Sequence, residues 1–247
     1  MARCEVPRDG LVLRIRLVAS DVDGTITERR GSLRLSIEAV RSIRMLERNG
    51  ITVSLVSGNS LPVVAGLSRY VGASGPSFGE NGCIALWRGS VIHYCEGRPS
   101  EELVREILAL GFKESWQNAF RFHDLAFLAQ NRHMAERVLP RVRELASKEG
   151  MRVLWSGYAI HVQPEGGGKG RAVREAARLL GISLGEVLAV GDGQNDIDMF
   201  LPGSLKACPG DADPEVKKRV DIIATRPGGE GFAEIARIVL AGTGQKP

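Results

Sequence analysis

The sequence lacks the features that mark several large classes of protein. Aromatic residues make up only 5% of its 247 residues, and no uninterrupted apolar run approaches the ~20 residues that a membrane-spanning helix needs. The cysteines are scattered and none forms a C-x-x-C pair, which argues against a zinc site and against a thioredoxin-like site. These absences favour a soluble, cytoplasmic protein with no membrane partner.

Cysteine is scarce, with four residues: Cys4, Cys83, Cys95 and Cys208. We expect all of them to be free, buried thiols, because disulfides are uncommon inside cells. A bridge between Cys83 and Cys95 is the less favoured alternative, since intracellular disulfides do occur in thermophiles.

An excess of charge of one sign is also missing. The net charge is +4, and in residues 86–162 Lys and Arg only slightly outnumber Asp and Glu. A nucleic-acid partner is therefore not expected, because such proteins concentrate basic residues on one surface. The hydrophobic content of 43% is ample for a buried core, and we expect a monomer or a homodimer.

What the sequence does contain is an alternation of apolar strands and amphipathic helices that is interrupted once. Residues 14–20 and 51–56 read as strands, and Ser36 caps a helix between them that ends at Gly50. The alternation resumes with a helix at 171–180, a strand at 187–190 and a last helix at 231–240. Right-handed crossovers then give an α/β fold with a doubly wound, mostly parallel sheet and a ligand site at the carboxyl ends of its strands.

The interruption has a different pattern. Between about residues 84 and 163, hairpin-like strands at 84–87 and 91–94 precede helices and further strands, which is typical of an α+β module. We therefore predict three segments: core (1–85), inserted cap (86–162) and core again (163–247).

The string Asp21-Val22-Asp23-Gly24-Thr25 carries the strongest chemical signal. Two carboxylates two residues apart at a strand end point the same way, so one can attack phosphorus while the other moves protons. A calcium loop is the alternative, but the glutamate that an EF-hand needs twelve residues later is absent near Leu33. The string resembles the first motif of the haloacid dehalogenase-like phosphatase superfamily, which implies a Rossmann-like core.

Three further motifs of that superfamily can be recognised in order. Ser57-Gly58-Asn59 follows the second strand and would bind the phosphoryl group. Lys169 opens a helix after the insertion, so that its ammonium and nearby N–H groups would face phosphate. The last motif follows an apolar strand and would supply oxygen ligands for a hard cation. It is the string Gly191-Asp192-Gly193-Gln194-Asn195-Asp196.

The resemblance extends to the cap, which lies between the second and third motifs. The sequence is similar to those of archaeal phosphoglycolate phosphatases at residues 57–64, at residues 78–82, and at residues 155–158 with His161. This implies hydrolysis of 2-phosphoglycolate through an aspartyl-phosphate, with Asp21 and Asp23 catalytic, Ser57, Gly58, Asn59 and Lys169 binding substrate, and Mg²⁺ held by Asp21, Asp23, Asp192 and Asp196.

Several alternatives stay open from the sequence. A sugar-phosphate phosphatase or a phosphomutase shares the same motifs, and a non-catalytic phosphoryl-binding scaffold is disfavoured because every catalytic position is filled. For His161, Trp155 and Tyr158, core packing is favoured over substrate contact. The partner of a substrate carboxylate stays unassigned among four candidates, Arg88, Arg98, Arg121 and Arg132.

Overall fold

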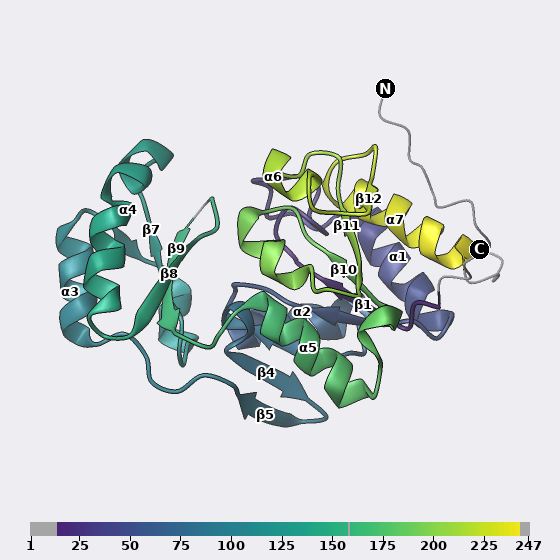
Figure 1. The fold of residues 1–247 in the computed structure, drawn as a ribbon, viewed down its shortest axis with the longest axis horizontal. Helices are drawn as coiled ribbons and strands as arrows, with labels where there is room; N and C mark the ends of the chain where they lie inside the picture. The colour runs from purple at the N-terminus through teal and green to yellow at the C-terminus, as the bar shows by residue number, and fades with distance from the viewer. Residues whose placement is uncertain (1–13, 158, 243–247) are drawn as a thin grey trace.

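The structure, a computed structural model, describes residues 14–157 and 159–242. The core is a five-stranded parallel sheet with the order β12-β11-β10-β1-β2 (Figure 1). Its strands are β1 (Leu17–Ser20), β2 (Thr52–Leu55), β10 (Val187–Val190), β11 (Leu205–Cys208) and β12 (Ile222–Ile223). The predicted α/β fold with a mostly parallel sheet is confirmed.

Helices cover both faces of this sheet, because the buried residues of β1 point alternately to one face and to the other. Val18 packs in a cluster with residues of α1 and α7, whereas Leu17 and Ala19 face the other way and pack with residues of α5. A strand buried on both faces reads as a continuous apolar run. The core helices are α1 (Ile37–Arg48), α2 (Leu61–Val71), α5 (Lys169–Leu180), α6 (Pro214–Lys217) and α7 (Gly228–Gly242), with the short helices η3 (Leu184–Glu186) and η4 (Gln194–Met199).

The start of α1 shows how local sequence sets an element. The hydroxyl of Ser36 accepts a hydrogen bond from the N–H of Ala39, which satisfies a donor that has no partner within the helix. The predicted Ser36 cap is confirmed.

The inserted segment forms a separate four-stranded antiparallel sheet with the order β6-β7-β9-β8. Its strands are β6 (Lys113–Glu114), β7 (Leu125–Leu128), β8 (Met151–Trp155) and β9 (Ala159–Pro164), with α3 (Glu101–Ala109), α4 (Arg132–Ser147) and the short helix η2 (Trp116–Phe120). These elements share one apolar cluster that includes Ile107, Phe127 and Val142. In Figure 1 they lie together on the left, apart from the parallel sheet.

A third, antiparallel sheet joins β3 (Ser77–Gly79), β4 (Ile84–Trp87) and β5 (Ser90–His93), with η1 (Glu80–Gly82) between β3 and β4. Val56 bridges Phe78 in parallel, which connects this sheet to the end of β2. The hairpin β4–β5 thus continues from the core, and the expected boundary at residue 86 passes through β4. We propose that the cap begins after the hairpin and ends near residue 164.

The expectation of free thiols was wrong for two of the cysteines. Cys83 and Cys95 form a disulfide with their Cα atoms 4.9 Å apart. The hairpin register explains this, because Ile84 pairs with His93 and places the two cysteines at the same end of the hairpin. Cys208 is free and buried, and burial raises the pKa of its thiol to about 12; Cys4 lies outside the described residues.

Among the described residues, no helix combines the length and the apolar character needed to cross a bilayer.

Candidate active site

The sheet brings three predicted site residues to one edge. Ser20, the last residue of β1, pairs with Val190 of β10 and with Leu55 of β2. Asp21, Ser57 and Asp192 follow these strands within two residues, so they lie at adjacent carboxyl ends of parallel strands. This is the edge at which open α/β sheets bind their ligands.

Three buried carboxylates gather at this edge. Asp21, Asp192 and Asp196 each offer an oxygen, and these oxygens lie within 4.8 Å of one another. Burial, and next the charge of Asp196, raise the pKa of Asp21 well above its usual value. The same two causes raise the pKa of Asp192 to about 7. Keeping these carboxylates ionised at the same time therefore costs free energy, unless a cation binds between them.

Lys169, the first residue of α5, is the ammonium at the centre of this group. Its Nζ donates to Asp21 Oδ1 at 2.6 Å and to Asp196 Oδ1 at 2.5 Å. Burial lowers the pKa of Lys169, but the two carboxylates outweigh burial and raise it above the usual value, so the ammonium stays charged.

Asp196 is held in turn by backbone donors. Its Oδ2 accepts from the N–H groups of Asp192 at 3.0 Å and Gly193 at 2.8 Å. Because Oδ1 accepts a hydrogen bond from Lys169, both oxygens of Asp196 have hydrogen-bond partners. This carboxylate therefore orients the ammonium toward Asp21.

The residues present fit a hard divalent cation. Three carboxylates stand against the single buried ammonium of Lys169, and oxygen ligands of this kind are those that Mg²⁺, Ca²⁺ and Mn²⁺ prefer. The backbone also approaches closely: a Cβ at Gly24, where φ is 87°, would lie 2.5 Å from Asp192 Oδ1. Only glycine allows this approach of the loop to the carboxylate.

Arg30 was not predicted to belong to the site. Its Nε lies 2.8 Å from Asp192 Oδ2, and Thr25 Oγ1 donates to the other oxygen of Asp192 at 3.2 Å. Arg30 therefore partly balances the charge that a divalent cation would balance.

Asp23 lies at the exposed rim of the site. Asn59 Nδ2 donates to Asp23 Oδ2 at 2.7 Å. Although the side chain reaches solvent, the surrounding protein displaces much of the nearby water, and this desolvation raises the pKa of Asp23 above its usual value. A raised pKa suits a carboxyl that must both donate and accept a proton.

The cap reaches Asp23 through Asn59. Gln117 of η2 donates to Asn59 Oδ1 at 2.7 Å and accepts from the N–H of Ser60 at 2.7 Å. Asn59 also donates from its N–H and from Nδ2 to Ser57 Oγ, at 3.1 and 3.0 Å. Because that hydroxyl accepts both bonds, the proton it carries can be given to a bound group.

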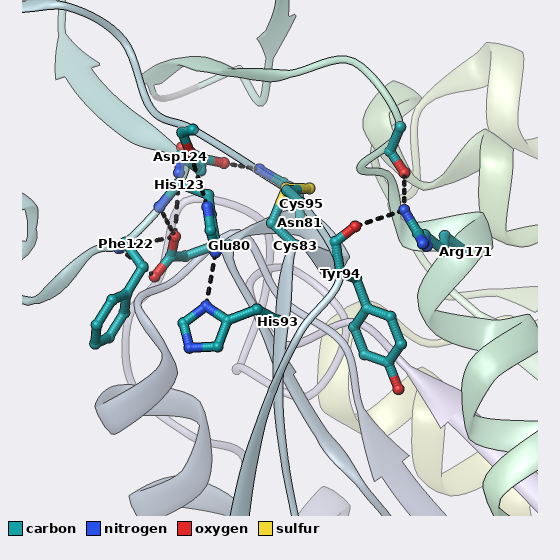
Figure 2. The surroundings of a disulfide bond; sticks show 12 residues. Glu80, Asn81, Cys83, His93, Tyr94, Cys95, Phe122, His123, Asp124 and Arg171 are labelled. Atoms are coloured by element: carbon teal, nitrogen blue, oxygen red, sulfur yellow. Dashed lines mark hydrogen bonds between the residues drawn. A yellow bond between two sulfur atoms is a disulfide. The ribbon is translucent and has the colours of Figure 1, made fainter.

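The cap is docked on the core through η1, as Figure 2 shows. The buried carboxylate of Glu80 accepts hydrogen bonds from the N–H groups of Phe122, His123 and Asp124, at 2.8–3.1 Å for the shortest of each. Glu80 and Asn81 both have positive φ, 52° and 51°. The turn is thus held in a strained conformation that points both side chains at the cap.

Arg30, Gln117 and Asp124 were not predicted from the sequence, and Glu80 and Asn81 were named only within residues 78–82, as part of the family resemblance. Polar residues directly after a buried strand are themselves a site signal. The other three lie in loops or on the cap, where no periodicity marks them. His161 is buried as expected, but its partner is polar, Asp124 at 2.9 Å. Trp155 packs against the cap core, and Tyr158 lies outside the described residues.

Comparison with known proteins identifies the family of the chain. The model of the haloacid dehalogenase-like hydrolases matches residues 18–149 and 117–235, which together span most of the chain. The chain belongs to this hydrolase family.

Relatives of known name cover nearly the whole chain. A protein of Aeropyrum pernix named phosphoglycolate phosphatase is 44% identical over 94% of this chain and 97% of its own length. A protein of the same name from Staphylothermus marinus is 36% identical over 92% of this chain and 98% of its own. Among solved structures, a Thermoplasma acidophilum protein superposes with a TM-score of 0.82 at 32% identity, covering 91% of this chain and 98% of its own.

Proposed function

We propose that this hydrolase is a Mg²⁺-dependent phosphatase that cleaves 2-phosphoglycolate into glycolate and phosphate through an aspartyl-phosphate on Asp21. The observation that carries the proposal is the position of the Asp21 carboxylate. It lies at the end of β1, bonded to the Lys169 ammonium at 2.6 Å and beside Asp192 and Asp196. The names of the relatives support the choice of substrate.

In the first step, an oxygen of Asp21 attacks phosphorus and the bond from phosphorus to the leaving oxygen breaks. Asp23 gives its proton to that oxygen, so the leaving group departs as a hydroxyl compound and not as an alkoxide. Lys169 and the Ser57 hydroxyl bind the phosphoryl oxygens, where negative charge gathers in the transition state. A bound Mg²⁺ would lie against Asp21, Asp192, Asp196 and a backbone oxygen of Asp23, and would neutralise further charge on the phosphoryl group.

In the second step, water attacks the phosphorus of the aspartyl-phosphate. Asp23, now ionised, takes a proton from that water, and the bond from phosphorus to Asp21 breaks. Phosphate leaves with the Asp21 carboxylate restored. Asn59, bonded to Asp23 at 2.7 Å, keeps the carboxyl aimed at the same place in both steps, since one position serves both proton transfers.

The test is phosphate release under one Mg²⁺ concentration from 2-phosphoglycolate, glucose 6-phosphate and erythrose 4-phosphate. We expect kcat/KM for phosphoglycolate to exceed both others at least tenfold, which corresponds to about 1.4 kcal/mol in transition-state binding. Equal values would indicate a broad sugar-phosphate phosphatase. Conversion between sugar phosphates without release of phosphate would indicate a mutase.

A further inference from the structure

The cap places a buried polar cluster directly over the loop of Ser57. Arg121 Nη2 donates to the carbonyl oxygen of Gly58 at 2.8 Å, and His161 Nδ1 lies 2.9 Å from Asp124 Oδ1. Asn81 Nδ2 donates to Asp124 Oδ2 at 2.6 Å (Figure 2). These four side chains come from three segments distant in sequence and meet beside Gly58.

The cluster approaches this loop so closely that a side chain at Gly58 would crowd it. A Cβ at Gly58 would lie 3.1 Å from Asn81 Oδ1 and 3.2 Å from His161 Cε1. Gly58 stands between Ser57, which faces the phosphoryl position, and Asn59, which holds Asp23. The cluster therefore borders the place where Asp23 would protonate a leaving oxygen.

The hydrogen-bonding capacity of the cluster is not exhausted. Within the described part of the chain, Arg121 Nε and Asn81 Oδ1 are buried without a hydrogen-bond partner, which is costly for polar atoms away from water. His161 uses Nδ1 on Asp124. Because a carboxylate can only accept, that nitrogen carries the hydrogen and Nε2 points elsewhere. The cluster therefore keeps hydrogen-bonding atoms that no other part of the described protein uses.

The charges of the cluster select the kind of ligand. Burial alone would raise the pKa of Asp124, but His161, Arg121 and Asn81 outweigh burial and lower it, so the group is an anion. Arg121 is a permanent cation. A carboxylate bound beside it would therefore meet a fixed positive charge.

The other arginines considered from the sequence are excluded by position. Arg88 stacks on Trp87, Arg132 is an exposed partner of Glu136, and Arg98 is exposed. Of the four candidates, Arg121 alone is buried and bonded to a loop of the active site.

We propose that His161 and Arg121 form the subsite for the leaving group, that this subsite binds a carboxylate, and that Asp124 and Asn81 position them. The proposal rests on the proposed function, since it concerns the alcohol that the phosphatase releases. Arg121 supplies a fixed positive charge to the carboxylate, and His161 lies beside it with Nδ1 held by Asp124.

The test uses two substrates that differ only at the group in question, 2-phosphoglycolate and ethyl phosphate. In His161→Asn, the amide nitrogen can replace Nδ1 in the bond to Asp124, while the far side of the imidazole with Nε2 is lost. We expect the wild-type preference for phosphoglycolate to fall at least tenfold, with ethyl phosphate changed less than about threefold. His133→Asn, at an exposed histidine of α4, is the matched control and should keep the preference.

A binding measurement separates this inference from the proposed function. Calorimetry on Asp21→Asn, which should bind but not turn over substrate, should give a Kd for phosphoglycolate that rises at least tenfold when His161→Asn is added. The Kd for ethyl phosphate should stay unchanged when His161→Asn is added. Arg121→Gln should act in the same direction, with its melting curve checked against wild type.

Three outcomes would overturn the subsite. They are an equal loss on both substrates, an unchanged preference, and a wild-type protein that prefers 2-hydroxyethyl phosphate over phosphoglycolate, since that result assigns the subsite to a hydroxyl. A wild-type protein that releases phosphate from no monoester contradicts the proposed function instead, and the binding measurement still decides the subsite.

Discussion

The core and the cap reach the active site in different ways. Core residues stand directly at the ends of neighbouring parallel strands, as Asp21 and Asp192 do. Cap residues act through loops: Gln117 reaches Asn59, and Arg121 reaches Gly58. In the proposed mechanism the core thus holds the charged groups that act on phosphorus, while the cap bonds to the loop beside them.

This difference leads us to expect that the core governs the reaction at phosphorus and that the cap governs which leaving group is accepted. Removing a core carboxylate should stop the reaction for every substrate, because each substrate shares the phosphoryl group. Removing a cap contact should change how well the site is assembled or which leaving group it accepts. The variants below test that division, beginning with the largest expected effect.

Asp21→Asn should lower kcat at least about 10⁵-fold with any monoester, since an amide does not attack phosphorus. Phosphate release measures the loss, and circular dichroism should show an intact fold because the amide is nearly isosteric. Glu102→Gln, at an exposed position of α3, is the control. Activity near that of wild type would refute the assignment of the nucleophile.

Removal of divalent cations should lower activity at least about 10⁴-fold, with Mg²⁺ restoring it. Stability should respond as well. Because the folded protein raises the pKa of Asp21 and Asp192, the latter to about 7, the stability they contribute is complete below their unfolded pKa near 3.9. It is lost as pH rises toward 7.

The Tm of the metal-free protein should therefore fall between about pH 4 and pH 7. Mg²⁺ at a hundred times its Kd should add about 2.7 kcal/mol and restore several degrees. Thermal melts with EDTA and with Mg²⁺ measure both effects. Full activity in EDTA, or best activity with zinc alone, would contradict a hard-cation site.

Asp23→Asn should slow both steps by about 10² to 10⁴-fold, the range for loss of a general acid and base. The nucleophile remains, so phosphoryl capture is still possible. Rapid quenching with radiolabelled substrate should trap label on the protein. Protein that stays unlabelled at every quench time argues against the covalent route.

The double variant Cys83→Ser, Cys95→Ser should lower the free energy of unfolding by about 2–4 kcal/mol, because the bridge restricts the unfolded chain. Denaturant titration measures this loss. Since neither sulfur contacts a reacting group, kcat should stay within about twofold where both proteins are folded. A loss of activity without a loss of stability would assign the bridge to the site instead.

Gln117→Leu should lower kcat about tenfold for all substrates alike, because one hydrogen bond to Asn59 is lost and Asp23 is held less firmly. Gln130→Leu, at an exposed position of the cap, is the control. A loss confined to phosphoglycolate would instead make Gln117 a specificity residue.

The sequence by itself predicted the residues that we propose to act on phosphorus. Asp21 and Asp23 end an apolar strand, where the alternation along the strand aims both carboxylates the same way. Ser57, Lys169 and Asp192 were identified by their order in the series of motifs that the family resemblance supplies. Parallel strands in register then bring such ends together, so order along the chain was enough to predict a shared site.

Only the tertiary structure showed which side chains of the cap reach the loop of Gly58. Asp124, Arg121 and His161 are brought to Gly58 by antiparallel pairing within the cap, Leu125 with Val162, and by the docking of η1 on the cap loop. Contacts made across two separate sheets have no local period, so no window of sequence displays them. The Cys83–Cys95 disulfide was the less favoured alternative for the same reason: it depends on the register of a hairpin, and register is a property of paired strands.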